Sequence, residues 1–146
     1  MPQALEHWQQ GLRSIEPDLL AQCLARYGVE VGRVLELVTS DPSLARRVCP
    51  HHDYIEAELV HAFRHEFACT ITDILARRTR IAWSSCQGLD LLSTLMALLQ
   101  RYGGLSRAQV TRQVEAYHHF LLQGLAFRPP LSAASSWSDM EGAQRR

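Results

Sequence analysis

Apolar residues recur every three or four positions along most of the chain, which is the spacing of amphipathic α-helices. The first such run covers residues 17–27, and Gly28 suits the residue that ends it, because glycine readily adopts the left-handed conformation that closes helices. A second helix is predicted over 29–39. Asp and Pro then suit the first positions of a short helix over 41–47.

The longest periodic run covers about 54–78 and predicts one long central helix. The polar and glycine-containing segment 84–88 interrupts the pattern. Two further helices are predicted over about 89–101 and 107–124, and Ser106 suits the N-cap of the last one.

Together these patterns predict an all-α fold, a single-domain bundle of five to six helices around the long central helix of about 54–78. Strand-like alternation is missing, and 49–53 is interpreted as a loop. The helical domain is predicted over 16–128, after an N-terminal extension over 1–15. Residues 129–146 begin with two prolines and contain few large apolar residues, so they are predicted to form a mobile tail.

Charge and composition narrow the function classes. The chain has 146 residues, which suits a single domain. Lys+Arg is 15 and Asp+Glu is 15, and this balance argues against nucleic acid as a partner, because phosphate binding needs an excess of cations. All of the cations are arginine, which excludes both a Schiff-base lysine and a P-loop lysine.

The cysteines and the apolar runs bear on location. Cys23, Cys49, Cys69 and Cys86 are too widely spaced for a disulfide scaffold, so they are interpreted as reduced thiols of a cytoplasmic protein. The sequence contains no apolar stretch of about 18 residues, so no transmembrane segment is predicted. The N-terminus also lacks the basic and apolar regions of a signal peptide.

Several short segments give the chain a family likeness. In order they are Arg26-Tyr27-Gly28, Tyr-Ile-Glu-Ala-Glu-Leu-Val (54–60), Arg-His-Glu-Phe-Ala (64–68), Asp-Ile-Leu (73–75) and Arg-Arg-Thr-Arg (77–80). Their order and spacing resemble the C-terminal helical domain of the FAD-dependent (aerobic) glycerol-3-phosphate dehydrogenases. The segment 106–121 resembles the closing helix of that domain, and the likeness covers about residues 16–125.

The resemblance implies a domain that works beside a catalytic one. The parent enzymes oxidise sn-glycerol 3-phosphate to dihydroxyacetone phosphate and pass electrons through FAD to quinone, at the cytoplasmic face of a membrane. Their flavin and substrate sites lie in a larger N-terminal domain, whose G-x-G-x-x-G turn has no counterpart in this sequence. We therefore expect this chain alone to bind no flavin, to be inactive, and to contribute no catalytic or cofactor-binding residue. The expected partner is the FAD/substrate domain.

Two Glu-x-x-His patterns, Glu58/His61 and Glu115/His118, leave a di-metal carboxylate bundle as an alternative, because positions i and i+3 share a helix face. On a continuous helix over 54–78, however, Glu58 and His61 fall opposite the apolar arc. Glu115 likewise lies outside the apolar stripe of the last helix. We therefore predict that these side chains face water and form no inward metal centre.

Two weaker ligand sets are also present. Cys49, His51 and His52 are suitable zinc ligands, but no fourth ligand stands at a suitable spacing. His61 and His65 are spaced as in H-E-x-x-H, yet the glutamate follows the second histidine, so the hydrolytic base is out of place. The sequence therefore predicts no tight metal site.

Four polar residues continue the apolar face of the predicted central helix, namely Glu66, Thr70, Asp73 and Arg77. Polar groups directed at a core cost free energy unless they are paired, and Asp73 and Arg77 have the i, i+4 spacing of an ion pair. Two interpretations stay open: an internal network, or a stripe that docks the flavin domain and is extended by Arg78 and Arg80. A free-standing helical interaction protein is the remaining functional alternative.

Overall fold

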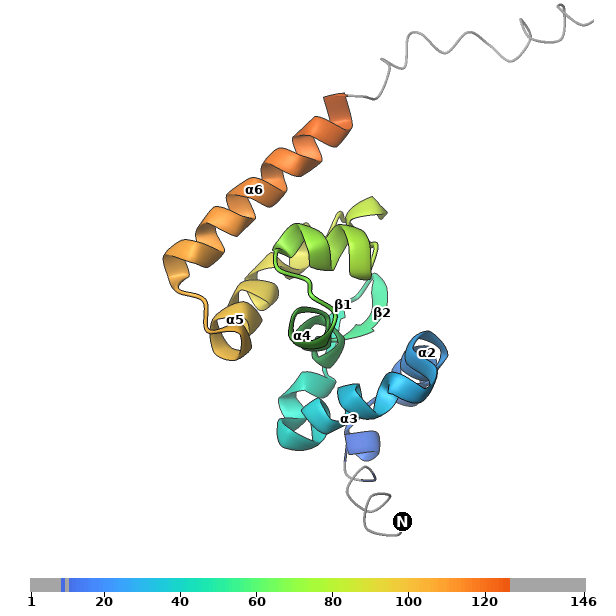
Figure 1. Cartoon of the computed structure of the whole chain (residues 1–146). Coiled ribbons are helices and arrows are strands. Elements are labelled where there is room, and N and C mark those ends of the chain that lie inside the picture. The colour runs from blue at the N-terminus through green and yellow to red at the C-terminus, as the bar shows by residue number, and fades with distance from the viewer. Residues whose placement is uncertain (1–8, 10, 127–146) are drawn as a thin grey trace, which may run out of the picture.

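The computed structural model describes residue 9 and residues 11–126. The α-helices in that part of the chain are α2 (Pro17–Tyr27), α3 (Val31–Ser40), α4 (Glu56–His65), α5 (Leu92–Gly103) and α6 (Arg107–Ala126). Shorter helical segments are η1 (Gly28–Glu30), η2 (Pro42–Ala45), η3 (Asp73–Arg78), η4 (Ile81–Trp83) and η5 (Leu89–Leu91), and two short strands are β1 (Arg47–Cys49) and β2 (His52–Ile55). The predicted all-α fold is confirmed, because helices make up nearly all of the regular structure (Figure 1).

Several helices begin and end where their capping residues indicate. Gly28 follows α2 with a φ of 52°, a left-handed conformation that glycine adopts without strain. Asp41 caps η2, because its carboxylate accepts a hydrogen bond from the Ser43 amide at 3.0 Å. Ser106 caps α6 through a 3.3 Å hydrogen bond from the Gln109 amide to its hydroxyl. These three predictions rested on local chemistry and are confirmed.

The strands β1 and β2 form an antiparallel hairpin in which Cys49 lies opposite His52. The interpretation of 49–53 as a loop is therefore wrong outside its two turn residues, Pro50 and His51. The strands have only three and four residues, so they are too short to show the alternation by which strands are recognised.

The prediction of one continuous central helix over 54–78 is also wrong. Its first residues belong to β2, and the chain breaks between α4 and η3. At the break Phe67 adopts the left-handed conformation, with a φ of 57°. The amides of Glu66 and Ala68 both bond back to the carbonyl of Ala62, at 3.1 and 3.2 Å, and so close the end of α4.

A capping box restarts the helix after this break. The Asp73 amide donates to the Thr70 hydroxyl, and the Thr70 amide donates to the Asp73 carboxylate, each at 3.0 Å. The same carboxylate accepts a hydrogen bond from the Cys69 amide at 3.2 Å. The apolar periodicity thus continues from α4 to η3, while the backbone does not.

Helix α4 lies at the centre of the molecule, where α3 and α5 both pack against it (Figure 1). All of its residues from Glu56 to Ala62 are buried. The prediction that Glu58 and His61 face water is therefore wrong, since their exposed fractions are 0% and 3%. The wheel argument failed because it assumed a helix with one free side, whereas neighbours cover both faces of α4.

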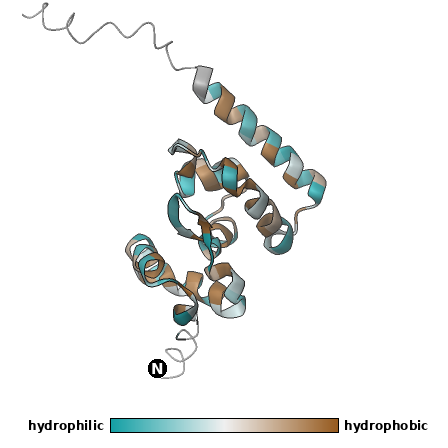
Figure 2. Ribbon diagram, turned by 180° about the vertical axis from the view of Figure 1, so that it is seen from behind, coloured by the Kyte–Doolittle hydropathy of each residue, from teal (hydrophilic) through white to brown (hydrophobic). Residues whose placement is uncertain are grey.

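Helix α6 packs one face against the core. Val110, Tyr117 and Leu121 are buried on that face, and the Tyr117 hydroxyl donates to the Gln87 carbonyl at 2.5 Å. Figure 2 shows hydrophilic residues interspersed with apolar ones along the helix. The tail predicted over 129–146 lies outside the described residues.

Trp83 connects three helical segments. Its ring in η4 lies edge-on to Phe120 of α6, with 5.8 Å between ring centroids. Its indole N–H donates to the carbonyl of Ala76 in η3 at 3.1 Å. One side chain therefore holds both η3 and α6.

Residues 11–15, which fall in the predicted N-terminal extension of 1–15, pack against α3. Ile15 is buried in the core. A Cβ added to Gly11 would lie 2.8 Å from the Thr39 hydroxyl and 3.2 Å from the Leu35 carbonyl, so only glycine permits this close approach.

Candidate functional site

An ion pair between the half-buried Arg26 side chain and the fully buried Glu58 side chain joins the last turn of α2 to the first turn of α4. The Arg26 guanidinium donates to both carboxylate oxygens of Glu58, at 2.8 and 3.0 Å. The Ile55 amide donates to the same carboxylate at 2.8 Å. The guanidinium also stacks on the Tyr54 ring, 4.0 Å from its centroid. Burial raises the pKa of Glu58, while these hydrogen bonds favour its charged form.

An open hollow of about 280 Å³ lies beside this pair. We call it the arginine hollow, and its lining residues are Arg26, Tyr27, Tyr54, Glu66, Arg77 and Arg78. They come from α2, β2, the end of α4 and η3. Three of these residues are arginines, but two of their guanidinium groups are already paired, Arg26 with Glu58 and Arg77 with Asp73, so the hollow is rich in arginine while its charges are largely compensated.

Behind the hollow, Tyr27 and Glu66 approach the buried imidazole of His61. The Tyr27 ring meets His61 edge-on, with centroids 5.2 Å apart, and burial raises the pKa of its hydroxyl, so Tyr27 stays neutral. His61 Nε2 lies 3.8 Å from a Glu66 carboxylate oxygen. His61 Nδ1 is buried and has no hydrogen-bond partner in the protein, and burial lowers the pKa of this imidazole. A neutral histidine is the form that this environment favours.

Phe67 directly follows Glu66, one of the residues that line the hollow. Its side chain is 90% exposed, and its backbone is left-handed, which is unfavourable for a bulky residue. Arg78 donates to the carbonyl of Glu66 at 2.5 Å and so ties η3 to this loop. The loop that follows α4 therefore presents a large apolar ring to solvent.

The six residues of the predicted polar stripe have different fates: Glu66, Arg77 and Arg78 line the hollow, Thr70 and Asp73 form the capping box, and Arg80 lies outside both. The predicted pair between Asp73 and Arg77 is present at 3.0 Å. The prediction that these residues share a core-facing side is wrong, because Thr70 is exposed and 77% of the Arg77 side chain is exposed. The break in the helix changes the direction of every residue after Phe67.

Sequence reasoning missed the other half of the hollow, namely Arg26, Tyr27 and Tyr54. The available signal was indirect, because all three belong to the segments that carry the family resemblance. These residues lie side by side because α2 packs against β2. That is a tertiary contact, and the periodicity of apolar residues along the sequence does not reveal it.

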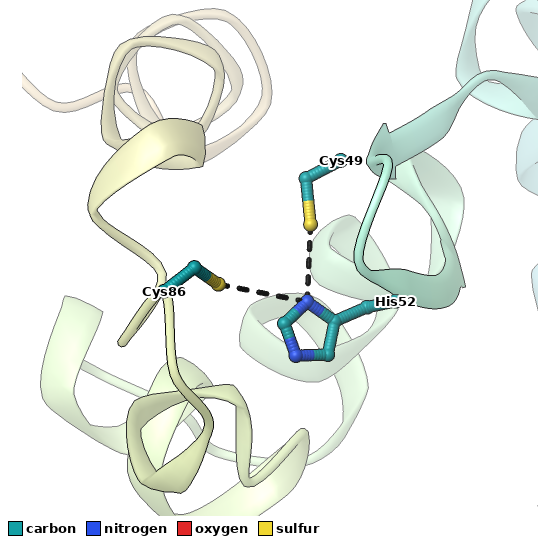
Figure 3. A group of neighbouring side chains, drawn as sticks. All are labelled: Cys49, His52 and Cys86. Atoms are coloured by element: carbon teal, nitrogen blue, oxygen red, sulfur yellow. Dashed lines mark hydrogen bonds between the residues drawn. The ribbon is translucent and has the colours of Figure 1, made fainter.

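Two thiols and an imidazole meet on another part of the molecule, as Figure 3 shows. The His52 Nδ1 atom lies 3.0 Å from the Cys49 sulfur and 3.9 Å from the Cys86 sulfur. Sequence reasoning considered Cys49, His51 and His52 together. The structure replaces His51, which is exposed in the hairpin turn, with Cys86 from the turn before η5.

The two Glu-x-x-His patterns are separated. Glu58 is held by Arg26, while Glu115 and His118 are exposed on α6. Among the residues that the structure describes, the only set of three or more potential metal ligands within reach of one another is the cysteine–histidine group of Figure 3.

The described residues form a helical domain with one short hairpin, and an ion pair ties α2 to the central helix α4. Residues 2–110 match the family described as the C-terminal domain of alpha-glycerophosphate oxidase. The chain belongs to this family, which confirms the resemblance drawn from the sequence. The match begins before residue 16, where the resemblance was expected to start.

Similar proteins are glycerol-3-phosphate dehydrogenases. The chain is 34% identical over 110 residues to that of Synechocystis sp., covering 75% of this chain and 20% of the relative. It is 31% identical over 107 residues to glycerol-3-phosphate dehydrogenase 2 of Mycobacterium bovis, covering 73% and 18%. The mitochondrial enzyme of Mus musculus is 27% identical over 120 residues, covering 81% and 16%. The chain therefore spans about a fifth of the length of these relatives. No solved structure matches it.

Proposed function

We propose that this chain is the C-terminal, non-catalytic domain of an FAD-dependent glycerol-3-phosphate dehydrogenase, and that it supports catalysis by docking on the FAD domain. The parent enzyme would convert sn-glycerol 3-phosphate to dihydroxyacetone phosphate and pass electrons through FAD to quinone. Because the chain corresponds to only about a fifth of its relatives, we assign this chemistry to the remainder of such an enzyme.

The observation that carries the proposal is the meeting of distant segments on one surface. Arg26 and Tyr27 come from α2, Tyr54 from β2, Glu66 from the end of α4, and residues 77–78 from η3. These are the segments on which the family resemblance rests. The surface that they build together is therefore the best candidate for a contact shared by the family.

The chemistry of this surface suits a protein partner. The exposed guanidinium groups of Arg77 and Arg78 are forks that match carboxylates, and Arg78 is oriented by its hydrogen bond to Glu66. Phe67 adds a large apolar ring, the kind of residue that anchors interfaces by filling a pocket. We infer that the docking surface of the FAD domain presents acidic side chains around an apolar pocket.

The polar groups inside the hollow support a structural role rather than a chemical one. Glu58 is occupied by Arg26 and by the Ile55 amide, so its carboxylate is not free to accept a proton from a substrate. Tyr27 is held neutral by burial. We therefore assign hydride transfer to the FAD domain and none of its steps to this chain.

The proposed cellular location is that of the parent enzyme. None of the helices within 11–126 is long and apolar enough to cross a bilayer. We propose a cytoplasmic enzyme that delivers electrons at the membrane surface and attaches there peripherally.

The docking proposal is tested by mixing this chain with the Synechocystis relative truncated to its flavin-containing part. We expect calorimetry to show saturable binding, and we expect this chain alone to show no flavin absorption. Phe67→Ser and Arg78→Ala should each weaken binding about 10- to 30-fold, the effect of removing an interface anchor.

Two matched substitutions on α6 are the controls. Leu122 and Arg112 are exposed, so Leu122→Ser and Arg112→Ala should leave the affinity unchanged within about twofold. Absence of binding by the wild-type chain, or an equal loss in the hollow and control variants, would contradict docking through the arginine hollow.

A further inference from the structure

The thiol–imidazole group of Figure 3 has the dimensions of a zinc site. The ligand atoms of Cys49, His52 and Cys86 all lie within 4.8 Å of one another, and their side chains point toward a common centre. Tetrahedral zinc, with bonds of about 2.3 Å to sulfur and 2.0–2.1 Å to nitrogen, holds such atoms about 3.5–3.8 Å apart. The sulfur–nitrogen separations of 3.0 and 3.9 Å lie on either side of this range.

The hairpin and one backbone amide hold the ligands of this group in place. Cys49 and His52 face each other across a two-residue turn, so the hairpin brings one thiol and one imidazole to the same point. The Gly88 amide donates a hydrogen bond to the Cys86 sulfur at 3.5 Å. Amide donors of this kind orient metal ligands and stabilise the negative charge on sulfur.

The donor set selects among metals. Two thiolates and one imidazole are soft or borderline ligands, which suit zinc and are unsuited to magnesium or calcium. Two thiolates also match the double charge of the ion. Cys49 is buried while His52 and Cys86 are half-buried, so the remaining side of the group is open to solvent. A water molecule can complete a tetrahedron there.

We propose that Cys49, His52 and Cys86 bind one Zn²⁺ ion, which fastens the β1–β2 hairpin to the turn before η5. The sequence predicted no metal site because Cys86 stands 34 residues from His52 and was not considered. The ion would close this long loop, and a tether between distant segments stabilises the folded state. This site is separate from the arginine hollow and does not depend on the docking proposal.

The test uses the full 146-residue chain, reduced and freed of metal by a chelator. Titration with Co²⁺ should produce the visible bands of tetrahedral cobalt and a thiolate-to-cobalt band, both saturating at about one equivalent. Zn²⁺ should abolish these bands by displacement. Saturating Zn²⁺ should also raise the unfolding midpoint by roughly 5 °C or more.

Matched variants distinguish this site from unspecific metal uptake. Cys86→Ser and His52→Asn should each weaken Zn²⁺ binding at least about 100-fold, because each removes one of three ligands. Cys69→Ser and His51→Asn remove exposed residues of the same types that lie outside the site, and they should bind like the wild type. Far-UV circular dichroism of each variant shows whether the fold is retained.

Three outcomes would overturn the proposal. The first is a reduced wild-type chain that takes up neither Co²⁺ nor Zn²⁺. The second is a folded Cys86→Ser variant with wild-type affinity. The third is a Cys49–Cys86 disulfide, found by mass spectrometry in protein isolated in the presence of Zn²⁺, because it would assign the two thiols to redox chemistry instead.

Discussion

Glu58 is a carboxylate without solvent contact, so its charge depends on Arg26. Arg26→Ala would leave that carboxylate buried and without its cation. We expect this substitution to lower the free energy of unfolding by about 3–5 kcal/mol, the usual effect of breaking a buried pair. Urea denaturation at pH 7 measures the loss. Arg112→Ala, an exposed change on α6, should stay within about 0.5 kcal/mol of the wild type.

The loss of unfolding free energy in Arg26→Ala should also depend on pH, and it should be smaller at low pH. Burial raises the pKa of Glu58, and removing the guanidinium removes the main opposing interaction. A carboxyl whose pKa is raised by folding favours the native state at low pH, and this contribution is lost as pH rises through the folded pKa. The deficit should therefore shrink between pH 7 and about pH 4.5. A deficit of equal size at both pH values would show that it does not arise from the Glu58 charge.

Asp41 should make stability depend on pH in the opposite sense. Hydrogen bonds from the Tyr102 hydroxyl and then from Ser43, together with the Arg101 guanidinium, lower the pKa of Asp41 to about 2. Its contribution is therefore present above the unfolded pKa near 4 and is lost as pH falls toward 2. Asp41→Asn should cost about 1–2 kcal/mol at pH 7, and most of this deficit should disappear as pH falls from about 4 to about 2. Asp90→Asn, an exposed change, is the control, and a deficit of the same size at pH 2 as at pH 7 would contradict the assignment.

At the scale of elements, η3 depends on its cap more than on its ion pair. Asp73→Ala removes half of the capping box and should cost about 1–2 kcal/mol. Arg77→Ala breaks only an exposed i, i+4 pair and should cost less than about 0.5 kcal/mol. Chemical denaturation of both variants separates the two interpretations of the polar stripe. A loss of several kcal/mol in Arg77→Ala would mean that Arg77 belongs to an internal network instead of a docking surface.

The helices that sequence predicted well are those with local signals at their ends. Gly28 closes α2 and Ser106 opens α6, and each acts through atoms a few residues away. The central helix failed because apolar residues keep their spacing across the break, and Phe67 is itself apolar. The only local sign of the new start was the Thr70-x-x-Asp73 capping box, which an uninterrupted apolar pattern obscured.

At the scale of the whole molecule, the predicted polar stripe included three of the six residues that line the arginine hollow, but it did not predict the hollow itself. Glu66, Arg77 and Arg78 were chosen because polar residues followed an apolar stripe, and the structure brings them together for a different reason. A hydrogen bond from Arg78 to the α4–η3 loop does so, and that loop exists only because the predicted helix is broken. Arg26 is held at the same surface by its ion pair with Glu58. Glu58 lies 32 residues further along the chain and is buried in the core. Contacts of this range depend on how helices pack, which spacing along one helix does not encode.

The position of Trp83 has an optical consequence. Its indole is hydrogen-bonded to η3 and packed against Phe120 of α6, so its emission depends on both contacts. Within 11–126 it is the only tryptophan, and Trp8 and Trp137 can be replaced by phenylalanine to isolate its signal. Departure of α6 would remove the aromatic neighbour, whereas unwinding of η3 would free the indole N–H. The molecule thus carries a built-in fluorophore that reports local opening of its C-terminal helix separately from global unfolding.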